Sequence, residues 1–147
     1  MNHDALLARA ASAQAAAYAP YSGFRVGAAL LCADGTVFTG ANVENASLGL
    51  TICAERNAVF AAVAAGHRDF SAVAVVADAD EPVAPCGACR QVLAEFTPEM
   101  TVVSRGSGGR AVWSLTELLP AGFRRIPGVG SRDSDVDSGN GQGSGTT

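Results

Sequence analysis

Apolar and polar residues along the chain follow patterns that predict helices and strands in turn. Residues 3–17 are rich in alanine and leucine, which favours a helix, and Pro20 prevents its continuation. Two apolar segments follow at 26–32 and 36–41. Because an Asp-Gly pair between them supplies the backbone freedom of a tight turn, we expect these two segments to form a β-hairpin.

The middle of the chain predicts a loop, a helix and a buried strand. Residues 42–50 have the composition of a loop, whereas 55–65 place alanine and valine at helical spacing and end before a glycine. The segment 71–77 is uncharged and bounded by aspartates, as expected of a strand that is buried on both faces. We therefore predict that residues 71–77 form the centre of the sheet.

Four shorter elements are expected in the next part of the chain. Residues 87–96 predict a helix that ends before Pro98. Strands are expected at 101–104 and 111–113. The sequence Ser-Leu-Thr-Glu is a capping-box pattern, and it opens a predicted short helix at 114–119.

The composition is that of a small soluble enzyme. The chain has 147 residues, 48% of them hydrophobic, and a net charge of −4. We expect one catalytic domain at 1–126 and a disordered tail at 127–147, where Gly, Ser, Asp and Asn leave almost nothing to bury. A membrane span needs about 20 consecutive apolar residues, and no segment of the chain approaches this length. No segment has the continuous apolar core of a signal peptide either. These observations predict a cytoplasmic protein with no membrane partner, and the acidic balance argues against a nucleic-acid partner.

Three of the four cysteines lie in two motifs that begin predicted helices. Cys53 starts Cys-Ala-Glu-Arg, and Cys86 and Cys89 lie in Pro-Cys-Gly-Ala-Cys-Arg. In a reducing compartment this grouping indicates a metal site rather than disulfides. Three thiolates fill three positions of a tetrahedral zinc ion and leave one open, as in catalytic zinc sites. Cys32 ends an apolar segment, and we interpret it as a buried free thiol rather than a ligand.

Two other interpretations of the cysteines remain open when the thiols are considered alone. They are a structural zinc ion with a fourth ligand elsewhere, and a redox pair formed by Cys86 and Cys89. A glutamate close behind Cys53 favours the catalytic interpretation, since base deaminases combine a three-cysteine zinc site, a non-ligand glutamate and a P-C-x-x-C segment.

The residues beside the cysteines suggest how such a site would work. Glu55 can take a proton from a water molecule that the metal acidifies and pass it on, although a glutamate in a first helical turn can also be simply solvated. Three thiolates on Zn²⁺ leave a net charge of −1, so nearby positive charge is needed. We expect it from the two helix starts and from Arg56, with Arg90 as the second candidate.

Further motifs give the chain a specific resemblance. Besides the two cysteine motifs they include segments 17–29, 42–45 and 117–123. From about residue 5 to residue 123, the sequence resembles the small, homotetrameric class of cytidine deaminases, within the cytidine and deoxycytidylate deaminase superfamily. The resemblance implies a three-layer α/β/α fold with a mixed five-strand sheet, one Zn²⁺ per subunit, and active sites shared between adjacent subunits.

The resemblance also implies roles for residues outside the zinc motifs. Asn42 and Glu44 are expected to bind the ribose hydroxyls, and Ala54 to belong to the substrate pocket. Phe24 is expected to pack near the pyrimidine, and Phe123 to reach the pocket of a neighbouring subunit. From their spacing alone, the two polar residues would be assigned to turns or solvent and the two phenylalanines to the core.

The implied reaction is the zinc-dependent hydrolytic deamination of cytidine and deoxycytidine to the uridine nucleosides and ammonia, as in pyrimidine salvage. Leu48 stands where this class often has tyrosine, so we expect altered affinity rather than lost activity. A deaminase of the blasticidin S type and a non-catalytic zinc module are the competing interpretations. Asn42 and Glu44 favour a plain nucleoside, and the absence of a basic stacking surface disfavours polynucleotide editing.

Overall fold

A computed structural model describes residues 1–129 of the chain. Apart from its first three residues, the tail predicted to be disordered at 127–147 lies outside the described residues. In chain order the elements are α1 (His3–Gln14), β1 (Val26–Cys32), β2 (Val37–Ala41), the 3₁₀ helix η1 (Leu48–Leu50), α2 (Ala54–Ala64), β3 (Phe70–Ala77), α3 (Gly87–Phe96), β4 (Thr101–Arg105), β5 (Arg110–Ser114) and α4 (Leu115–Leu118).

The five strands form one mixed sheet in the order β2-β1-β3-β4-β5. Strand β3 pairs antiparallel with β1 and parallel with β4, and the two outer pairs are antiparallel. The uncharged segment predicted to lie at the centre of the sheet therefore does so. The predicted hairpin is also confirmed: Gly35 has φ +89° in the turn between β1 and β2, where a side chain would be strained.

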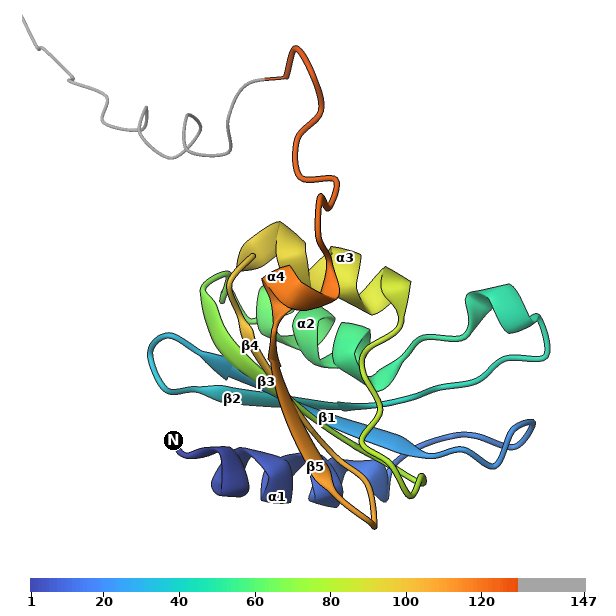
Figure 1. Ribbon diagram of the computed structural model, residues 1–147. Coiled ribbons are helices and arrows are strands. Elements are labelled where there is room, and N and C mark those ends of the chain that lie inside the picture. The colour runs from blue at the N-terminus through green and yellow to red at the C-terminus, as the bar shows by residue number, and fades with distance from the viewer. Residues whose placement is uncertain (130–147) are drawn as a thin grey trace, which may run out of the picture.

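Helices cover both faces of the sheet, so the predicted three-layer α/β/α fold is confirmed. In Figure 1, α1 lies against one face, and α2, α3 and α4 lie against the other. Two hydrophobic cores correspond to these faces. Leu6 and Leu7 of α1 pack over the first with Val103, whereas Val59 of α2 and Leu93 of α3 pack over the second.

Most element boundaries agree with the sequence-based prediction within one or two residues, and the first helix is the main exception. Helix α1 ends at Gln14 rather than at residue 17 because the backbone N–H groups of the next residues make turn-type bonds, such as that from Ala17 to the Gln14 carbonyl at 3.1 Å. Tyr18 then forms a parallel β-bridge with Val43, and its backbone N–H donates to the Asn42 carbonyl at 2.9 Å. The predicted loop at 42–50 contains the short helix η1.

The two cysteine motifs begin helices on the same face of the sheet. Cys53 is the N-cap of α2 and Cys86 is the N-cap of α3, as expected. Among residues 1–129, no helix is both long enough and apolar enough to cross a membrane.

Candidate active site

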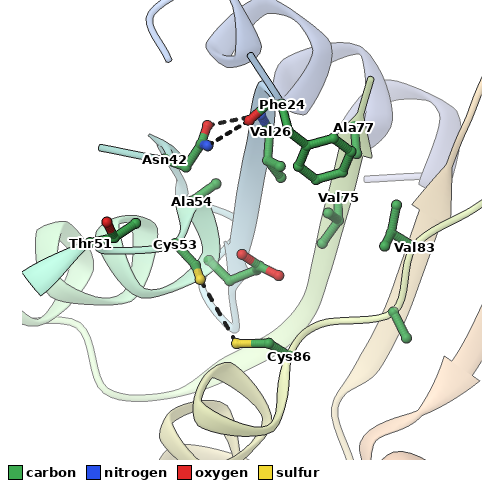
Figure 2. Close-up of a pocket in the computed structure, with 12 residues that line it drawn as sticks. Phe24, Val26, Asn42, Thr51, Cys53, Ala54, Val75, Ala77, Val83 and Cys86 are labelled. Carbon is green, nitrogen blue, oxygen red and sulfur yellow. Dashed lines mark hydrogen bonds between the residues drawn. The ribbon is translucent and has the colours of Figure 1, made fainter. Parts of the chain in front are cut away.

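The fold brings the three motif cysteines together, although 33 residues separate Cys53 from Cys86. Their sulfur atoms lie within 4.8 Å of one another, and the Sγ atoms of Cys53 and Cys86 are 3.8 Å apart (Figure 2). Sulfur atoms at about 2.3 Å from a tetrahedral zinc ion are roughly 3.8 Å apart, so this spacing fits zinc. The positive ends of α2 and α3 face the cluster, which favours thiolates there.

Arg56 supplies positive charge to the thiol cluster. Its Nη2 donates to the Sγ of Cys53 at 3.5 Å and to the carbonyl of Thr51 at 3.4 Å. Its Nε is buried and has no hydrogen-bond partner among the described residues. Arg90, the second candidate, donates instead to the carbonyls of Pro85 and Leu118, each at 2.7 Å, and holds the segment before Cys86 against α4.

The thiols interact strongly with one another. A hydrogen bond from the Cys89 thiol, helped by Arg56 and opposed by burial, lowers the pKa of Cys53 from 9.0 to about 5. The same hydrogen bond and burial raise the pKa of Cys89. A thiolate at Cys53 beside an arginine is a ready ligand for a divalent cation.

Glu55 lies beside these thiols but is not part of their cluster. Its side chain is buried, with the residue only 5% exposed, and it lines the pocket next to Cys53 and Cys86. Burial, followed by the charge on Cys53, raises the pKa of Glu55. A carboxyl group with a raised pKa is suited to both accepting and donating a proton. This one lies in the wall of a pocket, where a substrate could reach it.

The pocket that contains this carboxyl has a volume of about 190 Å³ and mostly apolar walls. Figure 2 shows Phe24, Val75 and Ala77 on one side of it and Cys53 and Cys86 below. The structure thus brings the predicted residues Phe24, Asn42 and Ala54 to the site. The lining residues that the sequence interpretation missed are Val26, Thr51, Val75, Ala77, Val83 and Ala84.

The Asn42 side chain uses most of its hydrogen-bonding groups to fix the backbone of the pocket wall. Its Oδ1 accepts from the backbone N–H of Val26 at 2.9 Å, and its Nδ2 donates to the carbonyl of Phe24 at 2.8 Å (Figure 2). One N–H of the amide remains beyond these two bonds. Because the side chain is buried and fixed in this way, that N–H has a defined direction.

Glu44 is not among the residues that line the pocket. Its carboxylate accepts hydrogen bonds from the backbone N–H groups of Tyr21 and Ser22 and from the Ser22 hydroxyl. These bonds, the one from the Ser22 side chain first, lower the pKa of Glu44. It is therefore an ionised acceptor that also orders the turn leading to Phe24.

Phe123 does not line the pocket of its own chain. The residue is 64% exposed, and its carbonyl accepts a hydrogen bond from Gln91 of α3. Leu48, which is 71% exposed, and Leu50 also present large apolar side chains on η1.

The thiol cluster and the buried carboxyl, carried on a three-layer fold, are typical of the zinc-dependent base deaminases. Residues 1–105 match the sequence family described as the cytidine and deoxycytidylate deaminase zinc-binding region, and the chain belongs to this family.

Individual relatives agree with this assignment. The cytidine deaminase of Halalkalibacterium halodurans is 54% identical over 125 residues, which cover 84% of this chain and 95% of that protein. The crystal structure of cytidine deaminase from Burkholderia pseudomallei, also 54% identical, superposes with a TM-score of 0.81 over 84% of this chain and 100% of that one. The blasticidin-S deaminase of Bacillus cereus is 30% identical over 108 residues, 68% of this chain and 77% of that protein. The chain is therefore a zinc-binding enzyme of the cytidine deaminase type.

Proposed function

We propose that this protein catalyses the hydrolysis of cytidine and deoxycytidine to uridine and deoxyuridine, with release of ammonia. The observation that carries the proposal is the buried carboxyl of Glu55, which faces an apolar pocket directly beside three clustered thiols. The names of the relatives at 54% identity support the same substrate class.

The residues that would hold the metal are Cys53, Cys86 and Cys89, with one Zn²⁺ in each subunit. A zinc ion at this site supplies a Lewis acid that makes a water molecule more acidic. Because three thiolates reduce the charge of the cation, the guanidinium of Arg56 and the two helix starts would restore part of the positive potential.

Glu55 would move the protons of the reaction. Its carboxylate accepts a proton from the attacking water and delivers it to N3 of the cytosine ring while the water oxygen bonds to C4. It then takes the second proton from that oxygen and gives it to the amine that leaves C4. Water is consumed, the C4–N bond breaks, and ammonia and the uracil nucleoside are the products. The apolar surroundings that raise the pKa of Glu55 favour this exchange.

The remaining pocket residues would position the nucleoside. Phe24 and Ala54 contact the base, and the free N–H of Asn42 donates to a ribose hydroxyl. Glu44 retains acceptor capacity beyond its bonds to the Tyr21–Ser22 turn, so its carboxylate can receive a second ribose hydroxyl.

We further propose that the catalytic unit is residues 1–126 and that four copies assemble with shared sites. Phe123 is exposed in the single chain and absent from its own pocket, which supports a role in a neighbouring pocket. The physiological role would be pyrimidine salvage in the cytoplasm.

The test is an assay of purified protein with its zinc content measured. Cytidine loss is followed by ultraviolet absorbance, and ammonia and uridine are quantified in the same samples. We expect equal amounts of both products. Blasticidin S is assayed in parallel, since one relative carries that name. A preference for the antibiotic would replace the proposed substrate, and zinc-loaded protein that leaves both compounds unchanged would contradict the proposal.

A further inference from the structure

A second group of potential metal ligands lies outside the active site. The Cys32 thiol, the Asp34 carboxylate and the His67 imidazole place their ligand atoms within 4.8 Å of one another. The sequence alone favoured a buried free thiol at Cys32, and the burial is confirmed. The two neighbours that the fold brings to this thiol change its interpretation.

The three side chains lie on a strand end, a hairpin turn and a helix cap that are fixed by backbone hydrogen bonds. Cys32 ends β1, and its backbone N–H and carbonyl are both bonded across the hairpin turn. Asp34 lies in that turn, where its Oδ1 accepts from the N–H of Thr36 at 2.9 Å and leaves Oδ2 available. His67 follows α2 in a Schellman cap: Gly66 has φ +92°, and the His67 N–H bonds to the Ala62 carbonyl at 2.9 Å.

The spacing and chemistry of these atoms suit a transition metal. The Nδ1 of His67 and the Oδ2 of Asp34 are 3.4 Å apart, and nitrogen and oxygen ligands at 2.0–2.1 Å from a tetrahedral zinc ion are roughly 3.4 Å apart. One thiolate and one carboxylate balance the charge of a divalent cation. A set of sulfur, nitrogen and oxygen donors selects zinc or a similar ion over magnesium or calcium.

Charge and access also favour a cation here. Burial raises the pKa of Cys32, and the charges of Asp34 and Asp69 raise it further, so without a cation the thiol is surrounded by negative charge. Metal binding would release the thiol proton to solvent. The Asp34 and His67 side chains are 57% and 26% exposed, so an ion can reach the cluster from outside.

We propose that Cys32, Asp34 and His67 bind a zinc ion, or a similar divalent transition metal, at the end of the sheet opposite the active site. Cys32 pairs with Phe70 at the start of β3, whereas Val75 and Ala77 at the other end of that strand line the catalytic pocket. Helix α2, about 16 Å long for its 11 residues, lies between Cys53 at its start and His67 after its end. The ion would therefore join the hairpin to the end of α2 and stabilise the fold without touching the substrate.

The test uses the full chain with zinc already in the active site. Co²⁺ is added, bound cobalt is counted by equilibrium dialysis, and the thiolate-to-cobalt absorption band is recorded while released zinc is measured. We expect one cobalt ion per chain, the absorption band of a single thiolate ligand, and no loss of zinc. In Cys32→Ala the band should disappear while cytidine turnover stays unchanged.

Two further variants keep the test valid if Cys32→Ala folds poorly. Asp34→Asn retains the oxygen that bonds Thr36, and His67→Phe retains the ring that packs on Phe38 at 5.1 Å. Each should weaken cobalt binding by roughly tenfold or more. Asp69→Asn is the matched control, because it removes a nearby charge but no donor of the cluster, and it should bind cobalt like the original protein.

Three results would overturn the proposal. They are a zinc-loaded protein that takes up no cobalt, an absorption band that survives in Cys32→Ala, and an equal loss of binding in Asp69→Asn. The first would leave Asp34 and His67 as a simple side-chain contact beside a buried thiol, and the last would indicate a diffuse acidic patch.

Discussion

Gly40 of β2 lies directly against the carbonyl of Ala54, the residue between Cys53 and Glu55. A Cβ atom at Gly40 would overlap that carbonyl oxygen and come within 2.5 Å of the backbone nitrogen of Ala58. The absence of a side chain at Gly40 therefore lets the first turn of α2 approach the sheet, and this approach sets the depth at which the cysteine and the glutamate enter the pocket.

Gly40→Ala should displace the start of α2. We expect a loss of about 1–3 kcal/mol in the free energy of unfolding, because the overlap is with backbone that cannot rotate away. Zinc affinity should fall as well, since Cys53 is moved. Denaturant unfolding and metal analysis measure the two effects. Gly109→Ala is the control, because its Cβ would make an ordinary 3.8 Å contact with Pro82. Equal stability of the two variants would contradict the argument.

Glu55→Gln should retain the fold and its zinc while losing turnover. The amide keeps the size of the side chain but cannot carry a proton, so kcat should fall by roughly 10²–10⁴-fold. Steady-state kinetics and zinc analysis on the same preparation provide the measurement. Glu99→Gln changes an exposed glutamate and should behave like the original protein. Near-normal turnover in Glu55→Gln would remove this residue from the mechanism.

Arg56→Gln should weaken zinc binding without abolishing it. The variant loses the positive charge 3.5 Å from the Cys53 sulfur, so we expect a decrease of roughly 10–100-fold in zinc affinity or activity. Competition with a chelator of known affinity reports the zinc constant. The matched change Arg9→Gln lies on the exposed side of α1 and should leave that constant unchanged.

Cys89→Ala should lose stoichiometric zinc and unfold at a lower temperature, because metal binding and folding are coupled. Cys32→Ala provides a direct comparison, since it also removes a buried thiol but should leave the active-site zinc in place. Metal analysis after gel filtration and thermal unfolding distinguish the two. A full equivalent of zinc at the active site of Cys89→Ala would contradict the ligand assignment.

Mixing two impaired variants tests whether sites are shared. Glu55→Gln lacks the proton carrier, and Phe123→Ala is expected to weaken substrate binding in the neighbouring pocket. If each site draws Glu55 and Phe123 from different chains, mixed assemblies contain some sites with both residues intact, so activity should exceed that of either variant at low cytidine concentration. A mixture no more active than the sum of its separately assayed parts would mean that each chain builds its own site.

Local sequence predicted most of the helices and strands and the two cysteine motifs, because those features depend on short-range patterns. The apolar segment that became β1 and the helix before Pro98 agree with the structure at both ends. Turn chemistry also predicted the hairpin and the capping box at Ser114. The predicted end of α1 was wrong, since the bridge between Tyr18 and Val43 is a contact between distant segments.

The remaining parts of the site depend on tertiary arrangement. Val83 and Ala84 line the pocket although nothing in their local pattern marks them, and their position just before the Pro-Cys motif is the signal that would have indicated them. Cys32 and His67 meet only because a hairpin and a helix cap end at the same edge of the sheet. The substrate roles of Glu44 and Phe123 stay predictions.

The start of α2 concentrates five separate tasks in five consecutive residues. Cys53 belongs to the thiol cluster, Ala54 touches Gly40 and the pocket, and Glu55 enters the pocket. Arg56 reaches back to sulfur, and Asn57 donates to the carbonyl of Ala41 at 2.8 Å. Because each residue turns a helix by roughly 100°, one insertion or deletion here would misdirect every later side chain.

This arrangement limits where the enzyme can be redesigned. A library of variants aimed at new substrates would gain little from changes in the first turn of α2, because each residue there already makes a required contact. Among the pocket residues outside helices and strands, Val83 and Ala84 take no part in the thiol cluster, the Asn42 hydrogen bonds or the contacts of Arg56. We expect variants with a broader choice of base or sugar to arise there, while the cysteines and the glutamate remain unchanged.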